Sequence, residues 1–252
     1  VTRRRVDVPT VFHRLIGNVG YIRISEFADV TASQFDRALA ELSASGALAF
    51  VLDVRNNPGG TIESAARILD GLLPAGPIVS ATYRDGTTEV LHTSDELFLD
   101  VPLVILHNAK SASAAELFAQ ALKDYGRATS VGVITKGKGT MQSIYSMADG
   151  SALDLTVAFY NPPVSPNFEG VGVKPDFEVR LTTDQDANFQ NLDETSDPQL
   201  KKALEVLLAK LRDIYGILPA QPDVVVVDPS TPSLPEIQPS ETPPVGNEDD
   251  VV

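Results

Sequence analysis

The chain contains no cysteine and no tryptophan, and only three histidines occur among its 252 residues. Without cysteine it has no disulfide framework, no thiol nucleophile and no thiolate metal site. A chain without cysteine is compatible with an oxidising or a reducing compartment, so the composition does not indicate which one it occupies. His13, His92 and His107 are far apart and fit no metal-ligand spacing. None of them is an obvious base for a Ser–His–Asp triad. We therefore predict no metal and no cofactor.

Basic clusters and long apolar runs are also missing. The net charge is −14, and without clustered Lys and Arg we expect no nucleic-acid partner. No run of 18 or more apolar residues exists, so no membrane span is predicted. The chain opens on Val1 inside a strand-like run and without a signal peptide, which is typical of a fragment or a processed form.

Strand and helix patterns alternate through the first two thirds of the sequence. Apolar strand runs occupy 19–24, 48–54, 101–107 and 131–134, and helical spacing occupies 31–44, 62–73 and 114–125. This order predicts an α/β layered fold with largely parallel strands. Antiparallel additions are predicted where two pairs of strands flank the turns Asp85-Gly86 and Asp149-Gly150.

The C-terminal quarter changes character. A helix is predicted over 197–211, with Asp197 as its cap and Pro198 at its first position. After Gly216 the chain is rich in proline and acids and shows no repeating apolar face, as in disordered segments. We predict a core at 11–182, a helical extension at 183–216 and a disordered acidic tail at 217–252.

The first segment that could take part in catalysis is a turn between a buried strand and a helix, Arg55-Asn56-Asn57-Pro58-Gly59-Gly60. Its glycines let backbone N–H groups face outward, and the helix N-terminus that follows favours negative charge. The turn is either an ordinary strand-to-helix connection or half of an oxyanion hole. In the second case the N–H of Gly59 or Gly60 is the donor.

The second segment opens the helix predicted at 114–125. Ser113, with Glu116 three residues later, fits a capping box, which alone is the commoner role for such a serine. The start of a helix also suits a nucleophilic serine, because the free backbone N–H groups there stabilise an oxyanion. The N–H of Ala114 would then be the second oxyanion donor.

The third segment is a lysine between two glycines, Gly137-Lys138-Gly139. A lysine acts as a general base only after losing its proton, and burial is what lowers a lysine pKa toward neutrality. Gln142 lies four residues on, which returns it to the same face of a strand, where its amide could hold the amine. The alternative is a solvated basic loop in which Lys136 and Lys138 are interchangeable.

Taken together, these segments resemble the carboxyl-terminal processing proteases, also called tail-specific proteases. The resemblance runs over about residues 6–179. It rests on four stretches: residues 55–60, 111–116, 137–142 and a closing strand, Gly170-Val171-Gly172-Val173-Lys174-Pro175-Asp176. Val133 and Lys136 depart from it, since the family usually carries an acidic residue and an aromatic there.

The resemblance implies a ClpP/crotonase-like core and a Ser113–Lys138 dyad with Gln142 as third member. It further implies a bacterial serine endopeptidase that cleaves protein or peptide substrates near their C-terminal tails through an acyl-enzyme, outside the cytoplasm. Residues 1–10 resemble the last strand of a PDZ domain. The oligomeric state is left open.

Two alternatives stay open. Interphotoreceptor retinoid-binding protein resembles this family in fold and binds apolar ligands, so the chain could be a non-catalytic binding module. It could also be a latent peptidase that needs its PDZ domain. The complete set of Ser113, Lys138 and Gln142 favours catalysis, because a binding module has no need of it.

Overall fold

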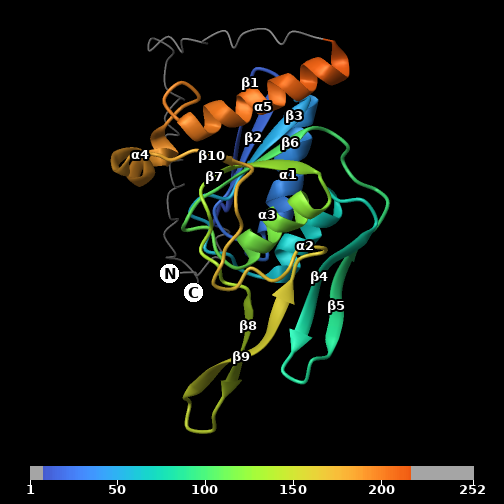
Figure 1. Cartoon of the computed structure of the whole chain (residues 1–252), viewed down its shortest axis with the longest axis vertical. Coiled ribbons are helices and arrows are strands. Elements are labelled where there is room, and N and C mark those ends of the chain that lie inside the picture. Colours follow the sequence, from blue (N-terminus) through green and yellow to red (C-terminus); the bar gives the residue numbers. More distant parts are fainter. Residues whose placement is uncertain (1–7, 217–252) are drawn as a thin grey trace, which may run out of the picture. The chain divides into compact units, whose positions relative to one another are not determined.

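Residues 8–216 are described by the computed structural model, and they fold around two β-sheets (Figure 1). Of the stub predicted at residues 1–10, only the last three residues fall in this range. The tail predicted at 217–252 lies outside it.

The first sheet has six strands in the order β1-β2-β3-β6-β7-β10. β1 runs antiparallel to β2, and the remaining neighbours are parallel, which confirms the predicted α/β class. Their bounds are Val11–Ile16, Val19–Ile24, Ala49–Asp53, Leu103–His107, Ala128–Gly132 and Phe177–Glu178.

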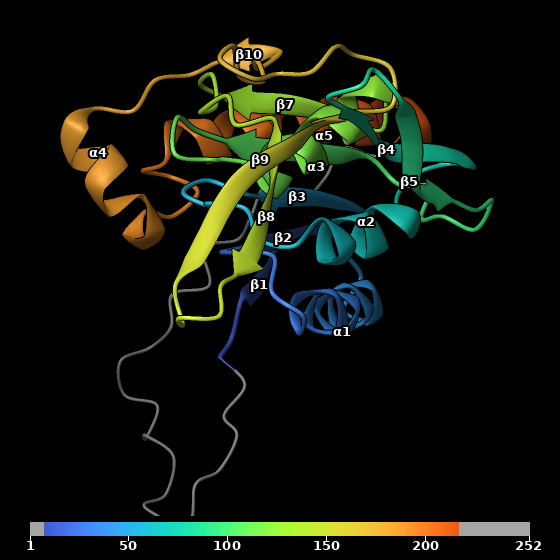
Figure 2. The ribbon, with the colours of Figure 1, turned by 90° about the horizontal axis from the view of Figure 1, so that it is seen from below.

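Helices cover both faces of this sheet, as Figure 2 shows for α5 on one side and α1 to α3 on the other. Their bounds are Thr31–Ala44 for α1, Ile62–Asp70 for α2, Ala114–Asp124 for α3, Thr183–Asn188 for α4 and Pro198–Tyr215 for α5. All four predicted helices are present. α5 is capped by Asp197 and begins at Pro198, as the sequence predicts.

Alternation along β3 shows why both faces must be covered. Ala49 and Val51 join the hydrophobic cluster that contains α5, whereas Phe50 and Leu52 join the cluster that contains α1 to α3. Successive side chains of a strand point to opposite faces, so an unbroken apolar strand needs helices on both sides. The same alternation continues in β6.

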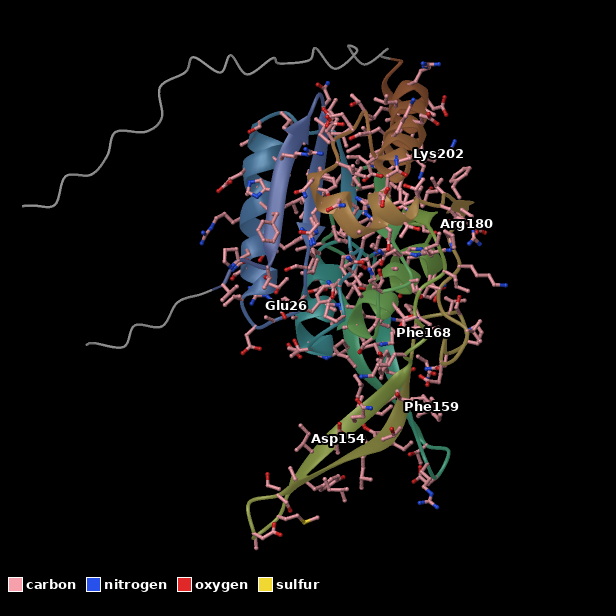
Figure 3. The ribbon with its side chains drawn as sticks, turned by 90° about the vertical axis from the view of Figure 1, so that its left-hand side faces the viewer. Glu26, Asp154, Phe159, Phe168, Arg180 and Lys202 are labelled. Atoms are coloured by element: carbon pink, nitrogen blue, oxygen red, sulfur yellow. The ribbon has the colours of Figure 1, made fainter. Side chains whose placement is uncertain are left out.

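The second sheet is antiparallel, in the order β5-β4-β9-β8. Its strands are Thr88–Ser94, Gly76–Tyr83, Ala152–Asn161 and Thr140–Ser146, so both predicted hairpins are confirmed. The hairpins extend away from the first sheet (Figure 1). Figure 3 shows Asp154 and Phe159 along β9, with Phe168 closer to the body of the fold.

Three strands differ from the prediction. β1 was not predicted, and β7 covers Ala128–Gly132 instead of 131–134. The closing strand expected at 170–176 is not formed there; the strand in this region is β10, at Phe177–Glu178. β7 begins with small and polar residues, and buried Ser130 is satisfied there because its N–H and hydroxyl both donate to Asp176. Hydrophobic periodicity does not detect a strand whose polar groups are paired in this way.

Within residues 8–216, no helix is both long and apolar enough to cross a lipid bilayer. The same residues contain no group of His, Cys, Asp and Glu side chains arranged to hold a metal ion.

Candidate active site

The candidate site forms where two neighbouring parallel strands end. β3 pairs with β6, with Asp53 opposite Leu106, so the turns that follow these strands lie side by side. Asn56 and Asn108 join the two turns: Asn108 Oδ1 accepts the N–H of Asn56 at 3.0 Å, and Asn108 Nδ2 donates to Asn56 Oδ1 at 2.7 Å. The carboxyl ends of parallel strands are the usual place for a site in such sheets.

Ser113 has an unusual backbone conformation, with φ 58° and ψ −123°. In residues 8–216, Asn56 is the only other non-glycine residue with positive φ. A serine held in this region costs about 1–3 kcal/mol, and such strain concentrates at functional sites. Ser113 and Asn56 lie in the two turns that Asn108 connects.

The two serines of this segment have different surroundings. Ser111 is buried; its hydroxyl donates to Val54 O at 2.7 Å and accepts the N–H of Asn108 at 3.0 Å. Ser113 is only half-buried, at the N-terminus of α3. Ser111 therefore holds the turns together, whereas Ser113 is the serine that a substrate could reach.

Gly59 lies directly against Ser113. A Cβ at Gly59 would stand 2.7 Å from Ser113 Cβ and 2.8 Å from Ala112 O, and its φ is +105°, so only glycine fits. Its N–H donates to Asn57 Oδ1 at 2.8 Å. For Gly60, the described residues provide no acceptor to its N–H. The N–H of Ala114 is the first of α3 and has no acceptor within the helix.

Glu116 connects the serine to the lysine segment. This fully buried carboxylate accepts four hydrogen bonds. Its Oε2 accepts the backbone N–H groups of Ser113 and Lys138, at 2.9 and 2.8 Å. Its Oε1 accepts Thr135 Oγ1 at 2.5 Å and the N–H of Gly137 at 2.6 Å. One oxygen atom therefore binds the backbones of both predicted dyad residues.

The side chains of Lys138 and Gln142 are not joined to the serine. Among the hydrogen bonds of the described residues, none involves Lys138 Nζ, and none links Gln142 to Lys138. Gln142 is exposed on β8, just after a register shift at Met141 that changes the strand's alternation. Ser113 Oγ lies instead 3.0 Å from the hydroxyl of Tyr160, a residue that no sequence pattern singled out.

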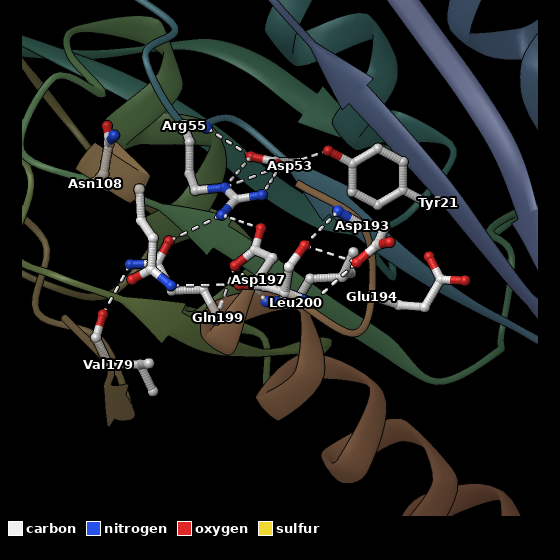
Figure 4. Close-up of polar contacts among 12 residues, drawn as sticks. Tyr21, Asp53, Arg55, Asn108, Val179, Asp193, Glu194, Asp197, Gln199 and Leu200 are labelled. Atoms are coloured by element: carbon white, nitrogen blue, oxygen red, sulfur yellow. Dashed lines mark hydrogen bonds and ion pairs between the residues drawn. The ribbon is translucent and has the colours of Figure 1, made fainter. Parts of the chain in front are cut away.

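Arg55, the first residue of the Arg55–Gly60 turn, is held in a buried ionic network (Figure 4). The Arg55 guanidinium binds Asp53 through Nε and Nη2, and through Nη1 it reaches Asp197 at 2.7 Å and Gln199 at 3.0 Å. The ring of Phe189 lies 4.6 Å from its central carbon. Burial opposes the charge, but the two carboxylates outweigh it and raise the pKa of Arg55 above its ordinary value.

The network joins the turn to α5. Asp197 Oδ1 also accepts the N–H groups of Gln199 and Leu200 at the start of that helix. The sequence predicted Asp197 as a cap but not as the ion-pair partner of Arg55. No local signal could have found that pair, because its members are far apart in the chain.

Known proteins are similar to this chain over the same residues. Residues 18–179 match the model of peptidase family S41. The carboxyl-terminal-processing protease of Synechocystis sp. is 38% identical over 190 residues, which cover 75% of this chain and 44% of that protein. The carboxy-terminal-processing protease of Bartonella bacilliformis is 34% identical over 185 residues, covering 71% and 43%. The chain thus spans less than half the length of these relatives.

Solved structures show the same similarity. The photosystem II D1 C-terminal processing protease superposes with a TM-score of 0.64 and 31% identity, covering 71% of this chain and 50% of that one. A putative peptidase from Parabacteroides merdae, at 20% identity and a TM-score of 0.62, shares the fold. The family model covers well over half of the sequence, and with these relatives it establishes that the chain belongs to peptidase family S41.

Proposed function

We propose that this chain is the catalytic core of a serine endopeptidase that cleaves proteins near their C-terminal tails, with Ser113 as nucleophile and Lys138 as general base. The observation that carries the proposal is Glu116 Oε2, which accepts the backbone N–H groups of both residues. A capping role for Ser113 alone would not require the glycine-flanked lysine segment to be bound by the same carboxylate.

In the proposed reaction, Lys138 Nζ takes the proton of Ser113 Oγ as that oxygen attacks the scissile carbonyl carbon. The lysine then gives the proton to the leaving amine, and water hydrolyses the acyl-enzyme. The oxyanion is bound by the N–H of Ala114 and by that of Gly60. Gly59, whose N–H already donates to Asn57, leaves the space that Ser113 occupies. Gln142 holds the lysine amine once substrate is bound.

Alanine variants test the dyad against a matched control. We expect Ser113→Ala and Lys138→Ala each to abolish cleavage of an unstructured protein such as casein. Lys136→Ala, which removes an exposed lysine two residues away, should leave cleavage within about twofold of the wild type. If Lys138→Ala cleaves as fast as Lys136→Ala, Lys138 is not the base.

A latent peptidase is the second candidate, and one observation favours it: Ser113 Oγ contacts Tyr160, while Lys138 Nζ has no hydrogen bond among the described residues. In this form, a PDZ domain or bound substrate would bring the amine onto the serine. The test compares casein cleavage by the chain alone with cleavage after a PDZ domain is fused ahead of Val1. Stimulation that requires Ser113 identifies the latent form.

The proposed substrates are proteins outside the bacterial cytoplasm, as the resemblance to the tail-specific proteases implies. The preference for tails is tested with two peptides that contain the same cleavage sequence. In one this sequence ends at a free C-terminus, and in the other further residues follow it. The ratio of their kcat/KM values measures the preference. The alternative is a non-catalytic module that binds apolar ligands. It predicts that the wild type does not cleave these peptides and that Ser113→Ala leaves ligand binding unchanged.

A further inference from the structure

Tyr160 places a phenol hydroxyl between the two proposed catalytic segments. The residue lies near the end of β9 and is 1% exposed. Its hydroxyl oxygen is 3.0 Å from Ser113 Oγ and 2.6 Å from the backbone oxygen of Lys138. Among the hydrogen bonds between side chains within residues 8–216, it is the one that involves Ser113 Oγ. Tyr160 belongs to the antiparallel sheet, whereas Ser113 follows β6 of the other sheet.

The position of this hydroxyl is fixed by its surroundings. The backbone N–H of Tyr160 donates to Gly139 O at 3.2 Å, and its carbonyl accepts Asn167 Nδ2 at 2.7 Å. The ring packs edge-on against Phe168, with centroids 5.8 Å apart. β9 is also paired with β4 here, with Tyr160 opposite Ala81. The phenol is therefore held by the root of the hairpin and not by its exposed outer part.

A hydroxyl at this buried position needs a reason beyond packing. Phenylalanine would fill the same space without a polar atom to satisfy. The single phenol proton has two acceptors in reach, Lys138 O and Ser113 Oγ, and it serves one of them at a time. Burial raises the pKa of Tyr160 above its ordinary value, so the phenol remains a neutral donor that keeps its proton.

We propose that Tyr160 is a further catalytic residue, whose hydroxyl donates to Ser113 Oγ while that oxygen carries developing negative charge. This inference rests on the proposed function. As the Oγ–H bond of Ser113 breaks, its proton passes to Lys138 Nζ and the Oγ–carbon bond to the substrate forms. Tyr160 transfers no proton; its hydrogen bond moves from Lys138 O to Ser113 Oγ.

The same donor acts in the second half of the reaction. When water attacks the acyl carbon, Lys138 Nζ, neutral after protonating the amine, takes one proton from the water. The bond between Ser113 Oγ and the acyl carbon then breaks and Oγ departs with the electron pair. The Tyr160 hydroxyl stabilises the departing oxygen until Lys138 Nζ gives it the proton taken from water. A fixed donor aimed at an atom that gains charge only during reaction lowers the barrier and adds nothing to substrate binding.

The test is Tyr160→Phe, which removes one oxygen atom and keeps the ring against Phe168. Tyr125→Phe is the matched control, because the Tyr125 hydroxyl also donates to a backbone oxygen, that of Pro77 at 2.9 Å, at the far end of α3. Casein cleavage and the rate of Ser113 labelling by a fluorophosphonate are measured for the wild type, both variants and Ser113→Ala. Thermal unfolding of each variant is recorded beside them.

We expect Tyr160→Phe to lower kcat and the labelling rate by about 10- to 100-fold with KM unchanged, and Tyr125→Phe to change neither. A purely structural role would lower the unfolding temperature and raise KM instead. The inference is overturned if Ser113→Ala is inert while Tyr160→Phe reacts at the wild-type rate. If Ser113→Ala itself still cleaves and labels, the proposed function fails, and the inference with it.

Discussion

Arg55 and Asp197 are separated by 142 positions in the chain, yet Nη1 of the first lies 2.7 Å from Oδ2 of the second, with both side chains about 1% exposed. Arg55 begins the turn that leads to Gly59 and Gly60, and Asp197 caps α5. Asp197 also lies beyond residues 18–179, the span that matches the family. α5 is therefore bound to the turn beside the candidate nucleophile through this ion pair and the hydrogen bond from Arg55 to Gln199.

Breaking this pair is expected to destabilise the fold strongly. Asp197→Ala leaves Arg55 buried with one carboxylate fewer, and we expect the free energy of unfolding to fall by about 3–5 kcal/mol. Asp197→Asn should cost less, because asparagine still caps a helix. Urea unfolding measures both.

Glu205→Ala is the control for the Asp197 variants. It breaks an exposed pair with Lys202 on the same helix and should change the unfolding free energy by less than about 1 kcal/mol. Equal effects at positions 197 and 205 would contradict the importance of the buried pair.

Gly59→Ala is expected to remove activity by steric means. The new Cβ would meet Ser113 Cβ at 2.7 Å, so the serine or the turn must move. Gly86→Ala is a matched control, since Gly86 has φ +86° but open space around it. Both variants carry backbone strain, and only Gly59→Ala should lose casein cleavage. Equal cleavage by the two variants would show that the contact with Ser113 is unimportant.

Glu116→Gln is expected to loosen the two proposed catalytic segments at once. The amide nitrogen that replaces one carboxylate oxygen would face two hydrogen-bond donors. Hydrogen bonds to a charged group contribute about 1.5–3 kcal/mol each, so the unfolding free energy should fall by about 3 kcal/mol or more. Casein cleavage should fall with it.

An exposed glutamate provides the comparison for Glu116→Gln. Glu96 lies on the surface, and Glu96→Gln should leave both stability and cleavage unchanged. If Glu116→Gln cleaves at the wild-type rate, the binding of both segments by Glu116 does not matter for activity, and the proposed function loses its main support.

His107 is expected to make stability depend on pH. It is fully buried, and its pKa is lowered to about 4. Burial is the main cause and nearby Lys123 adds to it, while the hydrogen bond to Val133 O and the charge of Asp176 oppose the shift. Nδ1 lies 2.9 Å from Val133 O, so it carries the proton, and Nε2 has no partner in the described part of the chain. The native state stays neutral at pH values where the unfolded chain, with a histidine pKa of about 6.5, binds a proton.

Stability linked to His107 is therefore complete above pH 6.5 and is lost as the pH falls toward 4. By pH 5 the loss should be about 2 kcal/mol, measured by urea unfolding at pH 7.5 and pH 5. His107→Asn keeps a donor for Val133 O and removes the titration. Between pH 7.5 and pH 5, the unfolding free energy of the variant should therefore fall by about 2 kcal/mol less than that of the wild type. An identical decline in both proteins would exclude His107 as its source.

Local patterns predicted much of this architecture, for identifiable reasons. The apolar run of β3, the helical spacing of α3 and the turn at Asp149-Gly150 are each encoded within a few neighbouring residues. Predictions failed where long-range contacts decide the structure. β10 has two residues and exists only because Phe177 and Glu178 pair with β7. Nothing nearby in the sequence distinguishes it from a loop.

The sequence by itself determined the family, the layered α/β class and the turns that carry Ser113, Gly59 and Lys138, because all of these depend on short motifs. Only the tertiary structure decided what those residues contact. Glu116 binds two segments at once, Tyr160 reaches Ser113 from another sheet, and Asp197 meets Arg55 across the whole domain. Contacts between distant positions depend on how the sheets and helices pack, and periodicity within a segment carries no information about them.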